Sequence, residues 1–194
     1  MNKNVQGHIF ALTANILWGL MAPIGKSALM EFSALSVTTF RMVGAAACFW
    51  LLSAFCKHEH VDHRDMLKIF FASLFALVFN QGVYIFGLSM TSPIDASIVT
   101  TTLPIVTMII AAIYLKEPIT NLKVLGIFVG AMGALTLILS SQATSNGNSS
   151  IIGDLLCLVA QISFSIYLTV FKGLSQKYSP ITLNKWMFIY ASMC

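Results

Sequence analysis

The feature that most constrains the fold of this chain is the recurrence, along its 194 residues, of uncharged apolar stretches. Each is about as long as a bilayer is thick, because about 20 helical residues cross a hydrocarbon core about 30 Å thick. Only 9% of the residues are charged and 57% are hydrophobic, whereas soluble domains carry about 25% charged residues. The sequence therefore predicts an all-α membrane protein, a polytopic helical bundle.

Six stretches are long enough to cross the membrane, and a seventh begins near Pro180. The predicted spans are 7–29, 34–55, 69–90, 94–115, 122–140 and 152–171. The seventh stretch is still apolar at Cys194, after only 15 residues, which is short for a crossing. We therefore expect six full transmembrane helices, part of a seventh, and a protein that continues beyond Cys194.

Basic residues are distributed unevenly between the two ends of the predicted spans. If the N-terminus faces the cytoplasm, nine of the 11 Lys and Arg residues lie on that side, at positions 3, 57, 64, 68, 116, 123, 172, 177 and 185. Lys26 lies on the other side and Arg41 within the second span. Cytoplasmic loops carry an excess of basic residues. We expect a multi-pass protein of the cytoplasmic (inner) membrane with a cytoplasmic N-terminus.

The chain also contains an internal repeat, with an offset of 146 residues. The most specific aligned pairs are Asn15 with Gln161, Trp18 with Phe164, Lys26 with Lys172 and Ser33 with Ser179. Five spans separate the copies, and an odd number reverses the direction in which the second copy enters the membrane. Inverted repeats of this kind are typical of secondary transporters. A repeat of this size predicts a complete length near twice 146 residues.

The repeat divides the chain into three parts. Residues 1–140 form the first repeat of five helices, and residues 151–194 begin the second, inverted repeat. The polar, uncharged sequence between them, at 141–150, is typical of a flexible linker.

Several positions resemble the EamA family of the drug/metabolite transporter superfamily. They are Asn15, Trp18, Gly19 and Lys26 in the first helix, Arg41 in the second, Pro104 and Glu117 in and after the fourth, and Gly126, Gly130 and Gly133 in the fifth. The resemblance implies ten helices in two inverted five-helix repeats, and export of metabolites such as amino acids by alternating access. The alternative is a non-transporting scaffold, or a half-transporter subunit that needs a partner.

A central cavity is predicted from polar and aromatic residues at mid-span. In the stretch from Thr100 to Pro118, Pro104 removes the hydrogen-bond donor for the Thr100 carbonyl and predicts a kink. Asn80 and Tyr84 lie four residues apart, on one helical face. The candidate substrate-binding residues are Asn15, Trp18, Asn80, Tyr84, Thr100, Thr101 and Gln161. Alternatively, the threonines bond back to their own helix, the amides join helices, and Trp18 only packs.

A second group is assigned to structure or gating: Pro104, Arg41, Glu117, Gly126, Gly130 and Gly133. Arg41 either extends its guanidinium to the outer headgroups, which we favour, or binds an anionic substrate group. Glu117 is expected to have a structural role in a cytoplasmic loop rather than to couple protons. The three glycines favour close helix packing within the bundle, with homodimerisation as the alternative.

The remaining motifs predict no chemistry. His58–Asp65 combines histidines and carboxylates, which we interpret as solvated loop residues rather than metal ligands. The sequence has no nucleophile elbow, phosphate loop or carboxylate pair within the spans. We therefore expect no enzyme activity, no cofactor, no metal and no nucleic-acid partner. The expected partners are a small-molecule substrate, the lipid bilayer and possible homodimer contacts.

Overall fold

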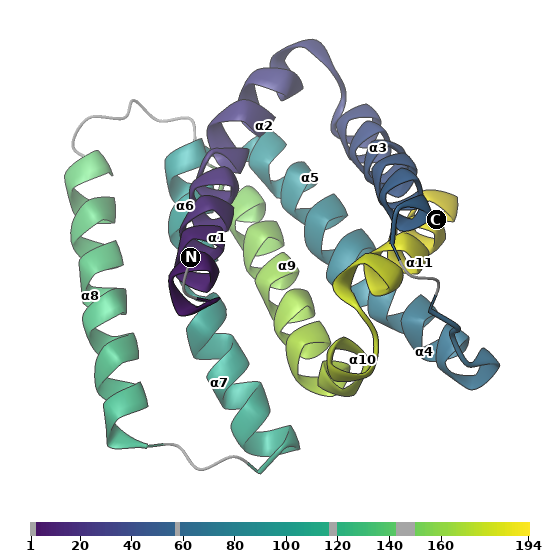
Figure 1. Ribbon diagram of the computed structural model, residues 1–194. Coiled ribbons are helices and arrows are strands. Elements are labelled where there is room, and N and C mark those ends of the chain that lie inside the picture. The colour runs from purple at the N-terminus through teal and green to yellow at the C-terminus, as the bar shows by residue number, and fades with distance from the viewer. Residues whose placement is uncertain (1–2, 57–58, 117–119, 143–149) are drawn as a thin grey trace.

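The computed structural model describes residues 3–56, 59–116, 120–142 and 150–194, and every regular element in these ranges is a helix (Figure 1). Five helical segments are long and apolar enough to cross a membrane. They are Val5–Glu31, Ala34–Ala54, His63–Met90, Pro93–Tyr114 and Ile151–Val170. They correspond to the predicted first, second, third, fourth and sixth spans. The prediction of a polytopic helical membrane protein is therefore confirmed.

The other two predicted stretches are helical as well. The predicted fifth span lies in α8 (Asn121–Gln142), a helix of 22 residues. The predicted seventh begins at Pro180 as α11 (Pro180–Met193). A short helix, α10 (Lys172–Lys177), connects it to the sixth span.

Two of the spans are interrupted, and both interruptions have the same cause. Each upstream helix ends four residues before a proline, at Gly19 before Pro23 and at Thr100 before Pro104. A proline has no N–H for the carbonyl four residues earlier, and its ring clashes with that carbonyl. The first span is α1 (Lys3–Gly19) and α2 (Met21–Glu31), and the fourth is α6 (Pro93–Thr100) and α7 (Leu103–Tyr114). The kink expected from Pro104 is therefore present.

The third span contains a different irregularity. It begins as α4 (His63–Ser73), continues as a π-helix, η1 (Leu74–Gly82), and ends as α5 (Val83–Met90). It also begins earlier than the predicted residue 69. π-Helices are rare and occur frequently at functional sites. The middle of the third span, where η1 lies, is therefore a candidate location for functional residues.

Serine residues cap the helices that follow the short turns. Ser33 precedes α3 (Ala34–Ala54) and accepts a hydrogen bond from the Ser36 N–H at 3.2 Å. Ser179 precedes α11 and accepts one from the Thr182 N–H at 3.3 Å. The preceding residues, Phe32 and Tyr178, are extended, with φ/ψ of −123°/149° and −115°/150°. The two turns, which the sequence repeat aligns, thus have nearly the same geometry.

The central helix is α9 (Ile151–Val170), which packs against η1, α5, α6 and α7. It approaches α5 most closely at two glycines: a Cβ added at Gly87 would lie 2.7 Å from the Gly153 carbonyl oxygen and 2.7 Å from Cys157 Sγ. Small residues of this kind allow membrane helices to pack closely. On the other side of the molecule, α3 packs along α11 (Figure 1).

Two contacts establish the direction of α9 relative to the first span. Lys26 in α2 donates from Nζ to the Thr91 carbonyl at 2.6 Å, directly after α5 ends. The Ser150 N–H donates to the Met90 carbonyl at 3.2 Å, directly before α9 begins. The first span therefore ends on the side of the bundle where α9 starts, and the two helices run in opposite directions (Figure 1).

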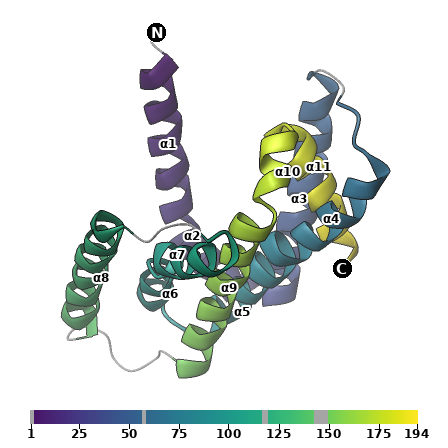
Figure 2. The same ribbon diagram turned by 90° about the horizontal axis from the view of Figure 1, so that it is seen from below.

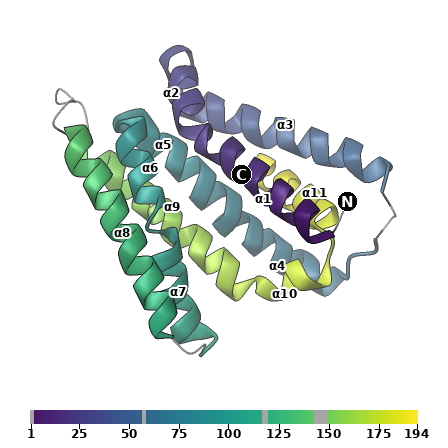
Figure 3. The same cartoon turned by 60° about the vertical axis from the view of Figure 1, so that its left-hand side comes forward.

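The bundle is not packed equally throughout. Figure 2 shows α1 standing away from the other helices, and its side chains from Val5 to Leu20 are exposed. Figure 3 shows α8 at the edge of the molecule, on the side of α7. Buried side chains instead concentrate where α3, the third span, α9 and α11 meet.

Candidate functional site

A cavity of about 550 Å³ lies among the first span, α3, the third span, α9 and α11. Of the seven predicted substrate-binding residues, five line it: Trp18, Asn80, Tyr84, Thr100 and Gln161. Its size is within the range of small-molecule sites, about 300–1,000 Å³. Polar side chains converge here inside helices that are otherwise apolar, so this cavity is the candidate site.

The π-helical segment helps to explain how the third span directs three polar residues into the cavity, beside Ala76 and Leu77. Successive residues of an α-helix are about 100° apart, which spreads neighbours over different faces. The i→i+5 bonding of η1 widens each turn and reduces that angle. As a result, Asn80, Gln81 and Tyr84 all line the cavity.

Asn80 and Gln161, the two predicted amides of the cavity lining, differ in how well they are bonded. Asn80 Nδ2 donates to the Ala160 carbonyl of α9 at 3.0 Å. Gln161 is only 3% exposed, and its Oε1 has no hydrogen-bond partner among the described groups. An unpaired buried acceptor costs about 1–3 kcal/mol. Gln161 therefore lines the cavity and has an unused polar atom buried beside it.

Aromatic rings form a further part of the cavity wall. Trp18 lies edge-on to Phe164 with ring centroids 5.9 Å apart and an interplanar angle of 75°. Phe164 in turn stacks on Tyr167 at 5.7 Å. Trp18 and Phe164, which the predicted repeat aligns with each other, both line this cavity.

Arg41 is directed into the cavity and not toward the outer headgroups, as we had favoured. Its Nη2 donates to Gln81 Oε1 at 2.9 Å and lies 3.6 Å from Met21 Sδ. A guanidinium at the centre of a membrane helix costs about 2.5–3.5 kcal/mol on insertion scales. The neutral Gln81 amide satisfies one donor but adds no opposite charge.

The other two predicted substrate-binding residues lie outside this cavity. Asn15 lines a smaller pocket of about 280 Å³ beside it, and its Nδ2 donates to the Ala11 carbonyl of its own helix at 2.8 Å. Thr101 donates to the Ile98 carbonyl at 2.6 Å. Thr100, although it borders the cavity, bonds back to Ala96 at 2.9 Å. All three polar groups are thus satisfied within their own helices.

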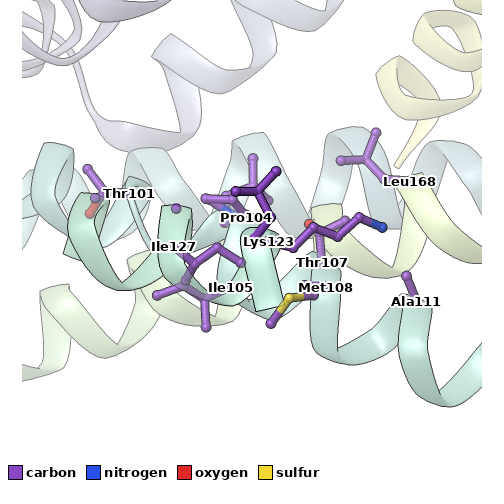
Figure 4. A pocket seen from close by; sticks show the side chains of 13 residues that line it. Thr101, Pro104, Ile105, Thr107, Met108, Ala111, Lys123, Ile127 and Leu168 are labelled. Atoms are coloured by element: carbon purple, nitrogen blue, oxygen red, sulfur yellow. The ribbon is translucent and has the colours of Figure 1, made fainter. Parts of the chain in front are cut away.

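A second hollow separates α7 from α8, and Figure 4 shows its lining. Thr101 and Pro104 lie here together with apolar side chains such as Met108 and Ile127. The volume is about 890 Å³. It is larger than the central cavity, but its lining is mostly apolar and offers few groups to orient a ligand.

The glycine face of α8 does not pack as we expected. No described atom lies within 4 Å of a Cβ built on Gly126, Gly130 or Gly133. The close helix contact uses Gly87 and Gly153 instead. Glu117 lies outside the described residues, so its predicted role stays a prediction.

The carboxylates of His58–Asp65 form a polar cluster with the α10–α11 turn. The Asp65 cluster comprises Glu59, Asp62, Asp65, Lys68, Lys177 and Tyr178. Lys177 Nζ lies 2.6 Å from both Asp62 and Asp65. Tyr178 donates its hydroxyl to Asp65 at 2.9 Å, and Glu59 accepts the Ser179 N–H at 3.0 Å. These carboxylates are committed to protein contacts rather than simply solvated.

The contacts of the cluster also shift its ionisation. The ion pairs with Asp62 and then Asp65 raise the pKa of Lys177 above its ordinary value. The hydrogen bond from the Ser179 N–H lowers the pKa of Glu59 below its ordinary value. Both shifts favour the charged forms that make the contacts.

Three polar residues of the cavity were absent from both predicted groups: Gln81, Tyr167 and Asn184. Gln81 is adjacent to Asn80 at mid-span, but only Asn80 and Tyr84, four residues apart, were assigned to one helical face. Asn184 follows the start of the seventh stretch, and its Nδ2 donates to the Pro180 carbonyl at 2.9 Å. Polarity within apolar sequence was the available signal for all three.

Several known proteins similar to this chain are described as uncharacterized transporters. An uncharacterized transporter of Archaeoglobus fulgidus is 29% identical over 185 residues, which cover 95% of this chain and 64% of that protein. The uncharacterized transporter YyaM of Bacillus subtilis is 24% identical over 195 residues, covering 98% and 64%. The chain thus spans less than two thirds of the length of these relatives. No solved structure matches the chain.

The family comparison agrees with the geometry. The model of the EamA-like transporter family matches residues 5–139, which include the first four membrane spans and α8 almost to its end. The central cavity lies largely within this range, with α9 and α11 completing it. On this match, the chain belongs to the EamA-like transporter family.

Proposed function

We propose that the chain is part of a secondary transporter that exports small metabolites, amino acids or related compounds, across the cytoplasmic membrane by alternating access. The observation that carries the proposal is the cavity of about 550 Å³ with amide, indole, phenol and guanidinium groups inside apolar helices. Such groups are costly in a membrane unless they pair or line a water-filled pathway. Asn80, Tyr84 and Gln161 would bond polar substrate groups, and Trp18 would pack on an apolar part.

An inverted repeat of the 5+5 type supports alternating access. The first span and α9 run in opposite directions, and the aligned turns before α3 and α11 have matching dihedral angles and serine caps. Ser92, before α6, has a similar cap, so the cap alone is not specific to the repeat. The specific support is the combination of matching turns with the Trp18–Phe164 contact.

Polar contacts at both ends of the helices suit a protein that opens first on one side and then on the other. At the proposed cytoplasmic side, the Asp65 cluster joins the start of the third span to the α10–α11 turn. At the opposite side, the Thr91 hydroxyl donates to Asp154 at 2.6 Å, joining α5 to α9. In the proposed mechanism one set of contacts breaks while the other holds.

The proposal includes orientation and partners. The N-terminus is cytoplasmic, consistent with the basic residues gathered at that end of the spans. The partners are the substrate and the bilayer. The open glycine face of α8 fits self-association, which cross-linking in native membranes tests.

The test is transport by the full-length protein in proteoliposomes, screened over amino acids and their derivatives, sugars and cationic drugs. Asn80→Leu should lower flux about tenfold or more, while the thermal unfolding temperature in detergent stays near the wild-type value. Thr13→Val is the matched control, because Thr13 is exposed and bonds only to its own helix at Ile9. Absence of any flux and of any ligand-dependent thermal shift would instead support the scaffold alternative.

A further inference from the structure

Among the described residues that line the central cavity, Arg41 alone carries a full charge. The other lining groups are amides, hydroxyls, thioethers, aromatic rings and aliphatic chains. In the described part of the chain, no carboxylate forms an ion pair with Arg41. The cavity wall therefore has a net charge of +1 in a segment that crosses the membrane.

The Arg41 guanidinium is held in place without being neutralised. Its Nη2 bonds to Gln81 Oε1, and Gln81 belongs to η1, so the π-helical segment positions the acceptor. A guanidinium has five N–H donors in a planar fork, and a carboxylate accepts two of them in parallel. An anionic ligand group can therefore supply the charge and the acceptors that Gln81 does not.

The number of charges limits the class of ligand. One cation is balanced by one negative charge, whereas a dianion such as a phosphate monoester would leave excess negative charge in the cavity. A zwitterion would leave the +1 charge unbalanced, and its ammonium group would meet only neutral acceptors. A monoanion is therefore preferred, because uncompensated charge is expensive in a low-dielectric interior.

The rest of the wall indicates the remainder of the ligand. Trp18, Phe164, Tyr167 and Phe188 suit an apolar body. The unpartnered amide atom of Gln161 offers one further polar contact. Together these groups describe a small monocarboxylate with an apolar portion and room for one polar substituent.

We infer that the transported substrate is a monoanionic carboxylate whose carboxyl group binds Arg41, and that this charge balance selects monocarboxylates over zwitterionic amino acids and neutral amides. The inference rests on the proposed function of a metabolite exporter, and within that function it favours monocarboxylates related to amino acids over the zwitterionic amino acids themselves. It makes Arg41 a substrate-binding residue rather than the structural residue that the sequence indicated.

The experiment uses three probes with the same phenylpropyl skeleton: 3-phenylpropionate, phenylalanine and 3-phenylpropionamide. Thermal unfolding of the full-length protein in detergent gives an apparent affinity for each, and proteoliposome flux gives transport. The expected order is 3-phenylpropionate first, phenylalanine second and the amide last. We expect about tenfold or more between the acid and the amide, as for loss of a charged hydrogen bond.

Arg41→Gln should remove the difference between acid and amide, and Arg41→Lys should keep part of it because the charge remains. Arg64→Gln is the matched control: Arg64 is the other arginine of the chain and is exposed in α4. The acid-to-amide ratio of the unmodified protein needs no variant, so a variant that fails to fold does not decide the test.

Each outcome has one meaning. An amide or a zwitterion that binds as tightly as the acid overturns the inference, as does an Arg41→Gln protein that retains the preference. In those cases, flux that persists leaves the proposed function standing. A protein that neither transports nor is stabilised by any compound of the wider screen overturns both.

Discussion

The central cavity and the Asp65 cluster both gather polar side chains from segments far apart in the sequence, yet they use them differently. In the cluster, each of the three carboxylates accepts a bond of 3.0 Å or less from an ammonium, a hydroxyl or a backbone N–H. In the cavity, Gln161 Oε1 has no partner among the residues that the structure describes, and the partners of Arg41 there, Gln81 and Met21, are neutral. Satisfied groups stabilise the fold, whereas groups with spare bonding capacity are available to a ligand.

The largest expected effect is on stability, at Gly87, which belongs neither to the central cavity nor to the Asp65 cluster. Gly87→Ala should lower stability by about 1–3 kcal/mol, because the added methyl overlaps Gly153 and Cys157 and forces α5 away from α9. Gly126→Ala is the control, with no described atom within 4 Å, and should gain about 0.5–1 kcal/mol from helix propensity. Equal thermal unfolding temperatures for the two variants would contradict the close α5–α9 contact.

Gln161→Leu tests whether the unpaired side-chain oxygen of Gln161 lowers the stability of the protein. Removal of the unpaired oxygen should stabilise the protein by about 1 kcal/mol, measured by thermal unfolding, while proteoliposome flux falls. Gln176→Leu replaces an exposed amide in α10 and should give neither change. A less stable Gln161→Leu protein would show that this amide makes stabilising bonds, as the carboxylates of the Asp65 cluster do.

Lys177→Met tests the opposite behaviour in the Asp65 cluster. It removes two contacts of 2.6 Å, to Asp62 and Asp65, whereas Lys68→Met removes one contact of 2.8 Å to Asp65. The unfolding temperature should fall further for Lys177→Met than for Lys68→Met, and neither variant should alter the ratio of acid to amide binding. A changed ratio would mean that the cluster also sets specificity.

The smallest expected effect is the pH dependence of the cluster. Because the pKa of Glu59 is lowered in the folded protein, its contact stabilises the fold fully above pH 4.5, the ordinary pKa of a glutamate. This stabilisation is lost as the pH falls through the pKa of Glu59 in the folded state. Because the pKa of Lys177 is raised in the folded protein, its ion pairs stabilise the fold fully below pH 10.5, the ordinary pKa of a lysine. This stabilisation is lost as the pH rises through the pKa of Lys177 in the folded state. The stability difference between wild type and Glu59→Gln should therefore be constant above about pH 5 and shrink in acid, whereas the difference between wild type and Lys177→Met should shrink only in alkali. A pH midpoint near neutrality for the change in either stability difference would contradict the prediction.

The comparison also shows which parts of the molecule the sequence could predict. Hydropathy located the spans because a bilayer fixes their length, and polarity at mid-span identified Asn80, Tyr84 and Gln161 as cavity residues. The direction of Arg41 depends on Gln81, and the phase of Gln81 depends on a π-helix that a 3.6-residue period does not contain. Neighbouring threonines likewise separated, with Thr100 at the cavity and Thr101 at the α7–α8 groove.

The Asp65 cluster was missed for another reason. Its partners are separated by more than 100 residues, as with Lys177 and Asp65, and no local pattern indicates which turn meets which loop. The predicted repeat paired Ser33 with Ser179, which cap helices in similar turns, but it could not show that the second turn binds a carboxylate loop.

The π-helical segment Leu74–Gly82 has a consequence for how this protein can change. The wide turn of a π-helix contains one extra residue, which an α-helix of the same length along its axis would not contain. Deletion of one residue there would convert the segment toward α-helix and rotate everything before it relative to Tyr84, without breaking the span. A single in-frame codon loss could thus turn Asn80 and Gln81 relative to the cavity, and alter its selectivity while the rest of the bundle is inherited unchanged.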